Sequence, residues 1–124
     1  MSIAMRLLGL ASVFILLGAY GSGTHAASKQ AKTTNGAIAF HRASQSYGYS
    51  VNKLTAREAQ TEALKQCGNE RCEVVARLKN NCGAVANGPQ RFSAATGVTR
   101  QEAETKALRI CGSACEMVAW ACTR

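Results

Sequence analysis

The feature that most constrains the fold of this chain is a segment that occurs twice. Residues 55–82 read TAREAQTEALKQCGNERCEVVARLKNNC, and residues 99–122 read TRQEAETKALRICGSACEMVAWAC. A shared pattern of Glu, Ala, Leu, Cys and Gly recurs at a spacing of 44 residues. Self-similarity at a fixed period indicates one supersecondary unit that is used twice.

Each copy predicts the same order of elements: two strands, a helix and a third strand. Thr55 and Thr99 each open a capping box, in which the threonine oxygen accepts from the backbone three residues on and a glutamate reaches back. Gly68 and Gly112 mark the helix ends, because glycine adopts the left-handed conformation at little cost. The strands are expected at residues 36–40, 47–51 and 73–79 in the first copy and at 83–87, 94–98 and 116–121 in the second.

The residues around the helices give two further expectations. Leu54 and Val98 precede the caps, where an apolar side chain can pack on the first turn as a hydrophobic staple. Alanines line one face of each helix and would allow a close approach to a sheet. Together the two units predict an α+β fold in which one mixed sheet carries both helices and disulfides staple the domain.

The first 26 residues have the organisation of a signal peptide. A short basic start ending at Arg6 is followed by the apolar run 7–20, and small residues ahead of the cut predict cleavage after Ala26. The run is shorter than the roughly 20 residues of a membrane span, and a buried N-terminal helix is the alternative. We therefore expect a secreted or periplasmic protein. The expected segments are a signal peptide at 1–26, a flexible tail at 27–35 and a single two-repeat domain at 36–124.

All six cysteines lie after the predicted cleavage point, and an even count in a short exported chain indicates three disulfides. Symmetry between the copies favours one bond across each turn from helix to strand and a third bond that joins the two copies. Zinc is the rival interpretation, but neither spacing is that of a zinc knuckle, and an oxidising compartment favours disulfides. The favoured pairs are Cys67–Cys72, Cys111–Cys115 and Cys82–Cys122.

The chain is basic, with 15 Lys and Arg against 7 glutamates, no aspartate and a net charge of +8. Removal of the signal peptide takes away Arg6 and leaves +7. A scattered basic surface provides solubility and can also attract an anionic partner, such as an envelope polymer, a lipid headgroup or an acidic protein. Nucleic acid is not an expected partner, because export removes the usual target and no recognised binding motif is present.

The order of these motifs resembles a known family. GAIAF (36–40), YGYSVN (47–52), EAxxxALxxCG, CxVVA and CGAVA (82–86) are similar to the pattern of small secreted, cysteine-rich bacterial proteins classed as a domain of unknown function. The resemblance covers about residues 36–122. It implies an exported, cysteine-bridged bacterial domain, and it implies no catalytic residue, cofactor or activity.

The residues do not predict an enzyme. His41 is the one histidine after the predicted cleavage point, and without aspartate no Ser-His-Asp arrangement exists. Glu58 and Glu102 are expected in helix caps, and the other glutamates on solvated faces. A small hydrolase that uses a pair of carboxylates, or His41 as a base, is the last of the alternatives. No metal or cofactor site is expected.

The aromatic and basic side chains provide the candidate binding residues. Trp120 stands where the first copy has Arg77. It either fills the core or covers a helix, or it forms an exposed platform for a sugar or a partner protein. Tyr47 and Tyr49 present the same alternatives. We predict a non-catalytic binding domain; the alternative is an inhibitor of an extracellular hydrolase that inserts loop 87–92 into a cleft. The candidate binding residues are Trp120, Tyr47, Tyr49, Arg42 and Arg91.

Overall fold

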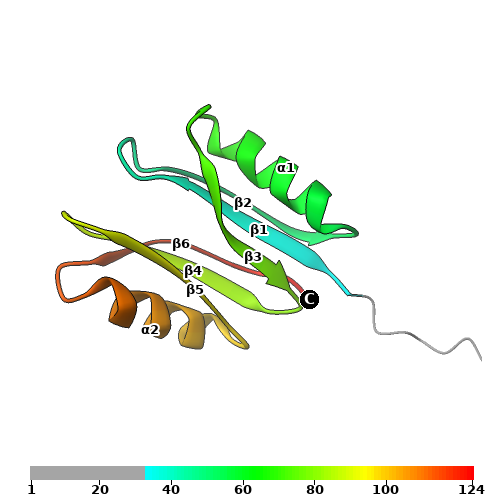
Figure 1. The fold of residues 1–124 in the computed structure, drawn as a ribbon. Helices are drawn as coiled ribbons and strands as arrows, with labels where there is room; N and C mark the ends of the chain where they lie inside the picture. Colours follow the sequence, from blue (N-terminus) through cyan, green and yellow to red (C-terminus); the bar gives the residue numbers. More distant parts are fainter. Residues whose placement is uncertain (1–32) are drawn as a thin grey trace, which may run out of the picture.

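The computed structural model describes residues 33–124, so the expected signal peptide and most of the expected tail lie outside the described residues. Each half of the described chain has the predicted order of two strands, a helix and a third strand (Figure 1). The elements are β1 (Asn35–His41), β2 (Ser46–Lys53), α1 (Ala56–Cys67), β3 (Glu73–Lys79), β4 (Cys82–Asn87), β5 (Phe92–Gly97), α2 (Arg100–Cys111) and β6 (Glu116–Cys122).

The strands form two separate sheets, and not the one mixed sheet that the sequence suggested. The first sheet has the order β2-β1-β3 and the second has the order β5-β4-β6, with every neighbouring pair antiparallel. The sheets lie face to face, with α1 on the outer side of the first and α2 on the outer side of the second (Figure 1). The predicted α+β class is therefore confirmed, in an arrangement of four layers.

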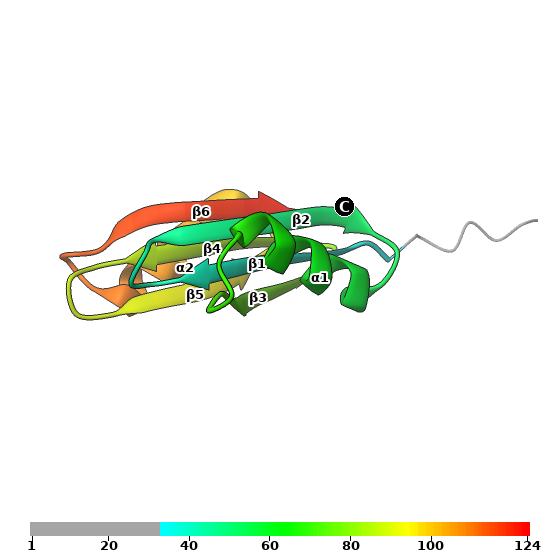
Figure 2. The same ribbon diagram turned by 90° about the horizontal axis from the view of Figure 1, so that it is seen from above.

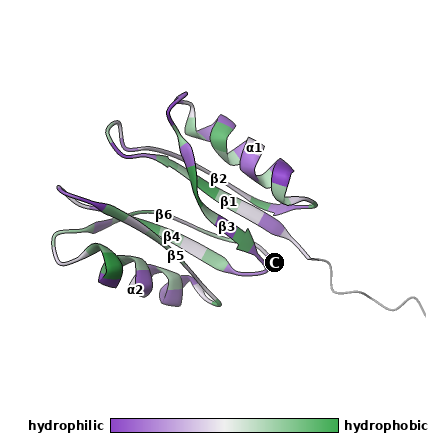
Figure 3. Ribbon diagram, viewed as in Figure 1, coloured by the Kyte–Doolittle hydropathy of each residue, from purple (hydrophilic) through white to green (hydrophobic). Residues whose placement is uncertain are grey.

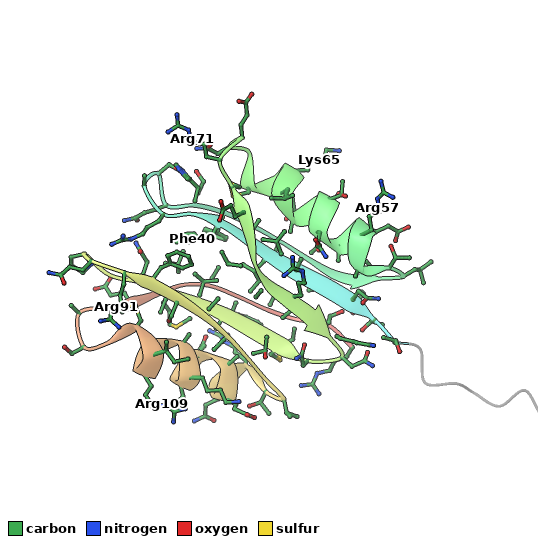
Figure 4. The ribbon with its side chains drawn as sticks, in the orientation of Figure 1. Phe40, Arg57, Lys65, Arg71, Arg91 and Arg109 are labelled. Atoms are coloured by element: carbon green, nitrogen blue, oxygen red, sulfur yellow. A yellow bond between two sulfur atoms is a disulfide. The ribbon has the colours of Figure 1, made fainter. Side chains whose placement is uncertain are left out.

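The central strands β1 and β4 explain this layering, because both of their faces are buried. Ala37 and Ala39 pack on the side of α1, whereas Ile38 and Phe40 enter the core between the sheets (Figure 4). In β4, Val85 takes the inner position. A strand with two buried faces needs a layer on each side, so each sheet covers the inner face of the other.

The helices lie close to their sheets because small residues line the contact. Ala59 and Ala63 of α1, and Ala103 and Ala107 of α2, are fully buried. Both helices also carry hydrophilic residues (Figure 3), which occupy their exposed positions. A Cβ atom added to Gly48 of β2 would lie 2.3 Å from the carbonyl oxygen of Ala63. The close approach of α1 therefore requires glycine at this position.

Both helices begin at the predicted threonine caps. Thr55 Oγ1 accepts from Glu58 N, and Thr99 Oγ1 accepts from Glu102 N, each at 3.1 Å. In α2 the glutamate also reaches back, and its Oε2 accepts from Val98 N at 3.2 Å. This bond goes to the residue before the cap and not to the cap itself. Within residues 33–124 no such bond forms at Glu58, so the glutamate reaches back at α2 alone.

Glu102 also forms an ion pair with Lys106, whose Nζ lies 2.8 Å from Oε1. The hydrogen bond from Lys106, followed by the bond from Val98 N, holds the pKa of Glu102 below its ordinary value. The predicted hydrophobic staples are wrong, because Leu54 and Val98 are 73% and 69% exposed. The fourth position of each helix is a buried alanine, so no long side chain is available to meet them.

The cysteines pair as predicted, and no cysteine among the described residues is free. The prediction that the third bond joins the two halves is wrong, however. Cys82 begins β4 and faces Cys122 of β6 in register, so this bond lies within the second sheet. The three pairs are Cys67–Cys72, Cys111–Cys115 and Cys82–Cys122.

Thr123 ties the two halves together at one end of the sheets, and it is fully buried. Its Oγ1 accepts from Asn52 N at 2.8 Å and donates to Thr34 Oγ1 at 3.0 Å. Its backbone N donates to Asn81 O at 2.9 Å. The C-terminal segment is therefore hydrogen-bonded to the end of β2, to the residue before β1 and to the link between β3 and β4.

Candidate functional site

The tyrosines that were predicted as binding residues lie on the edge strand β2. Gly48 and Ser50 face α1, and the Ser50 hydroxyl donates to Ala59 O. Because successive side chains of a strand point to opposite faces, Tyr47 and Tyr49 point away from the helix. Their side chains are 47% and 44% exposed, so neither fills the core.

The tyrosines line a groove between β2 and β6, which we call the tyrosine groove. These two edge strands lie on the same side of the molecule (Figure 2), and neither has a further strand partner among residues 33–124. The groove has a volume of about 390 Å³. Its lining is Tyr47, Tyr49 and Val51 from β2 and residues 118–122 from β6.

Trp120 lies on the β6 wall of the same groove and is 42% exposed. Arg100 Cζ lies 3.8 Å from the centroid of its ring, which is a cation–π contact. The guanidinium is held in turn by Glu104, at 2.7 Å from Nε to Oε1. Trp120 therefore does not fill the core: its ring stacks on an arginine of α2 and stays partly exposed. Sequence reasoning missed Arg100 as its partner, because the two residues belong to different elements of the chain.

The structure does not bring Arg42 and Arg91 to the tyrosine groove. Arg42 lies in the turn between β1 and β2, and its Nη2 donates to Gly88 O at 3.4 Å. Arg91 precedes β5, and its Nη1 donates to Ile110 O at 3.5 Å (Figure 4). Arg42 thus contacts the loop before β5 and Arg91 contacts the last turn of α2, both at the end where the helices terminate. The five predicted residues thus form an aromatic group and a separate pair of arginines.

The loop from Gly88 to Arg91 is closed and braced. Gly88 N donates to Arg91 O at 2.8 Å. A Cβ atom on Gly88 would lie 2.7 Å from Cys115 Sγ, so the loop rests directly on the Cys111–Cys115 disulfide. Pro89, Gln90 and Arg91 are exposed. The segment predicted as an inhibitory loop is therefore a supported projection at the surface.

His41 connects two turns. Its Nδ1 lies 2.6 Å from Ser44 Oγ and 3.2 Å from Asn69 Nδ2, which joins the β1–β2 turn to the turn after α1. In the part of the chain that the structure describes, no group of three or more histidine, cysteine and carboxylate side chains could hold a metal ion. The chemistry that the surface offers is that of aromatic rings, guanidinium groups and strand edges.

Comparison with known proteins gives the family. A family described as a domain of unknown function, DUF4189, matches residues 35–122. The chain belongs to this family. The matched span runs from the first residue of β1 to the last residue of β6, so the DUF4189 domain is the whole four-layer fold.

The relatives of this DUF4189 domain are mycobacterial. The uncharacterized proteins Rv1813c of Mycobacterium tuberculosis and Mb1843c of Mycobacterium bovis are each 39% identical over 88 residues, which is 70% of this chain. The chain spans 59% of the length of these relatives. An NMR structure of Rv1813c resembles the fold with a TM-score of 0.60 and 34% identity, covering 72% of this chain and 74% of that chain.

Neither α1 nor α2, the helices within residues 33–124, is long and apolar enough to cross a bilayer. The three disulfides are compatible with a periplasmic or extracellular site, where such bonds persist.

Proposed function

We propose that this DUF4189 protein is an exported, non-catalytic binding domain that holds an anionic partner. The observation that carries the proposal is the tyrosine groove, an open channel with half-exposed aromatic rings on one wall. Export is supported by the signal-peptide organisation of residues 1–26 and by cysteines that are all paired in the described domain.

The shape and chemistry of the groove suit an extended polymer. Tyr47 and Tyr49 are two residues apart on one face of β2, which places them about 7 Å apart along the strand. Each ring presents an apolar face together with a hydroxyl group, so it can both stack and hydrogen-bond. The net positive charge of the chain attracts a negatively charged polymer and raises its rate of encounter.

The absence of a catalytic role is part of the proposal and is supported by the engagement of titratable groups. His41 is occupied by contacts to two neighbouring turns. Glu102 and Glu104 are held in ion pairs with basic residues of α2. Groups that stabilise caps and turns in this way are poorly placed for proton transfer to a substrate.

The test is a titration of the oxidised protein with an anionic polysaccharide and with a neutral one of similar length. Fluorescence of Trp120, the single tryptophan, reports occupancy of the groove. We expect binding of the anionic polymer that weakens as the salt concentration rises. The double substitution Tyr47→Ala and Tyr49→Ala should weaken it by about tenfold, because two stacking contacts are lost.

Phe92→Ala is the matched control. Phe92 is opposite the end of β4 in the second sheet, as Tyr47 is opposite Phe40 of β1 in the first. It is also half-exposed, at 40%, but it lies outside the groove lining. An equal loss of affinity in this control, or full affinity in the double tyrosine variant, would contradict the assignment of the groove.

The braced loop favours a second candidate function, inhibition of an extracellular hydrolase. Residues 88–91 project from the surface and rest on the Cys111–Cys115 disulfide, as an inserting loop requires. An inhibitor would block one hydrolase of an extracellular panel at one-to-one stoichiometry, with little effect of salt. Arg91→Ala would then relieve the inhibition while the double tyrosine variant retained it.

A further inference from the structure

The end of the molecule where both helices begin has a surface of its own, which we call the cap end. Hydrogen bonds hold its parts together: Arg124 Nη2 donates to Val98 O at 2.6 Å, and Arg124 N donates to Asn52 Oδ1 at 3.1 Å. Asn35 pairs with Lys53 on one side and Lys79 on the other. The cap end comprises residues 53–57, 79–81, 98–100 and 123–124.

Two aliphatic side chains stand out from the cap end. Leu54 is 73% exposed and Val98 is 69% exposed, and no other large apolar side chain in the described part of the chain is as exposed. Each occupies the position just before a helix cap, where it makes no staple. The fold therefore leaves one apolar tip ahead of each helix, at the same end of the molecule.

Unpaired cations surround these tips. Within residues 33–124 the ion pairs are Arg100 with Glu104 and Lys106 with Glu102, so both carboxylates of α2 in this region are neutralised. Glu58 is the remaining carboxylate in the first turn of α1. Arg57 extends away from the start of α1 (Figure 4). At the cap end, the cations that form no ion pair with a described carboxylate are Lys53, Arg57, Lys79 and Arg124.

We propose that the cap end docks on an anionic lipid surface. Leu54 and Val98 enter the boundary between headgroups and acyl chains, while the surrounding lysines and arginines meet the lipid phosphates. The described chain also starts near this end, where Thr34 accepts from Thr123 Oγ1. This surface is separate from the tyrosine groove, and the inference goes beyond the proposed function.

The form of the cap end favours a lipid surface over an acidic protein. Leu54 and Val98 stand on separate turns, and each is followed directly by the threonine that caps a helix. Protein interfaces depend instead on central clusters rich in Trp, Tyr and Arg. Apolar tips set among cations fit a bilayer interface, where each tip can enter independently and every phosphate is an equivalent partner.

The experiment is co-sedimentation of the oxidised protein with vesicles of phosphatidylcholine, with and without phosphatidylglycerol. We expect strong binding when phosphatidylglycerol is present and little without it. The double substitution Leu54→Ser and Val98→Ser should lower the partition coefficient by about tenfold. Lys53→Glu and Lys79→Glu should each lower it by about fivefold or more. All variants share one N-terminal segment, so its own lipid affinity cancels in the comparison.

Two controls test the location. Ile110→Ser changes an aliphatic side chain that is 55% exposed but lies in the last turn of α2, far from the cap end. Lys65→Glu reverses a charge in the last turn of α1. Both variants should bind vesicles as the wild type does, and urea unfolding confirms that every variant is folded.

Several outcomes would overturn the proposal. Full vesicle binding by the Leu54 and Val98 double variant would show that the tips do not enter the lipid. Binding to soluble polyglutamate but not to anionic vesicles would assign the cap end to an acidic polypeptide. Loss of vesicle binding in the Tyr47→Ala and Tyr49→Ala variant would move the lipid contact to the groove, whereas intact binding supports two separate surfaces.

Discussion

Single side chains set how closely each helix approaches its sheet. On β2, Gly48 leaves room for the backbone of α1. At the matching position of β5, Ser93 instead donates its hydroxyl to Ala107 O at 2.5 Å. A sheet residue beneath one of these helices is therefore either too small to collide or hydrogen-bonded to the helix backbone.

Gly48→Ala should be strongly destabilising. The added Cβ would lie 2.3 Å from Ala63 O and from Cys67 N, which are backbone atoms and yield only if α1 moves. We expect the free energy of unfolding in urea to fall by about 2–3 kcal/mol. The neighbouring change Tyr49→Phe removes only an exposed hydroxyl and should stay within about 0.5 kcal/mol of wild type. Wild-type stability in Gly48→Ala would mean that α1 does not lie this close to β2.

Glu102 predicts a pH-dependent contribution to stability. Its pKa lies below the ordinary value of 4.5, so its stabilising effect is present above that pH and is lost as the pH falls through the lowered pKa. The Tm of Glu102→Gln should therefore be lower than that of wild type at neutral pH, and the difference should close in acid. Glu58→Gln, its counterpart in α1, should show a smaller difference in the same calorimetric series. A difference in Tm between Glu102→Gln and wild type that persists at strongly acid pH would contradict this explanation.

For single residues, the sequence predicted those features that depend only on nearby residues in the chain. The caps at Thr55 and Thr99 were predicted because a cap needs only the next few residues. The staples at Leu54 and Val98 failed because the required partner position holds alanine. The contact between Trp120 and Arg100 was not predicted, because the arginine belongs to another element.

At the scale of elements, the strands and helices were predicted to within about two residues. Their arrangement in two separate sheets was not predicted, and the first strand, β1, shows why. Ala37, Ile38, Ala39 and Phe40 are all apolar, so a central strand covered on both faces looks the same whether a helix or a second sheet covers it. The assignment of the faces becomes visible only in three dimensions, where alanines meet α1 and larger residues meet the opposite sheet.

The disulfides should differ in their contribution to stability. Cys82–Cys122 closes a separation of 40 residues, and its removal by alanine at both positions should lower the free energy of unfolding by about 4 kcal/mol. Cys67–Cys72 closes a separation of 5, and its removal should lower it by about 2 kcal/mol. Guanidinium unfolding of the two double variants checks the order. A larger loss from the shorter loop would show that native-state contacts outweigh chain entropy here.

At the scale of the whole molecule, one apolar layer joins the two halves. Ile38 is fully buried between the sheets, next to residues from both of them. Ile38→Ala should lower the free energy of unfolding by about 3 kcal/mol, because it leaves a cavity that two rigid sheets fill poorly. Leu64→Ala, on the partly exposed side of α1, should cost much less.

The two halves should also unfold together in this variant and in wild type. Fluorescence of Trp120 reports the second half, and circular dichroism reports both halves. Separate transitions for the two signals would show that the halves are independent domains, which the shared core does not predict.

The sequence could not predict the tyrosine groove, because the groove depends on how the two sheets stack. Tyr47 and Tyr49 were named as candidates because aromatic residues alternated with small ones in β2. The groove itself exists because two sheets stack so that β2 and β6 end on the same side. No local pattern carries that information, so its residues were found and its shape was not.

The contact between Thr34 and Thr123, whose hydroxyl oxygens lie 3.0 Å apart, brings the start of β1 and the end of β6 to one point. A domain whose two ends lie close together can be inserted into a surface loop of a host protein without distorting the domain or the host. It can also be circularly permuted, with a short peptide across these ends and new termini at the exposed turn near Ala43.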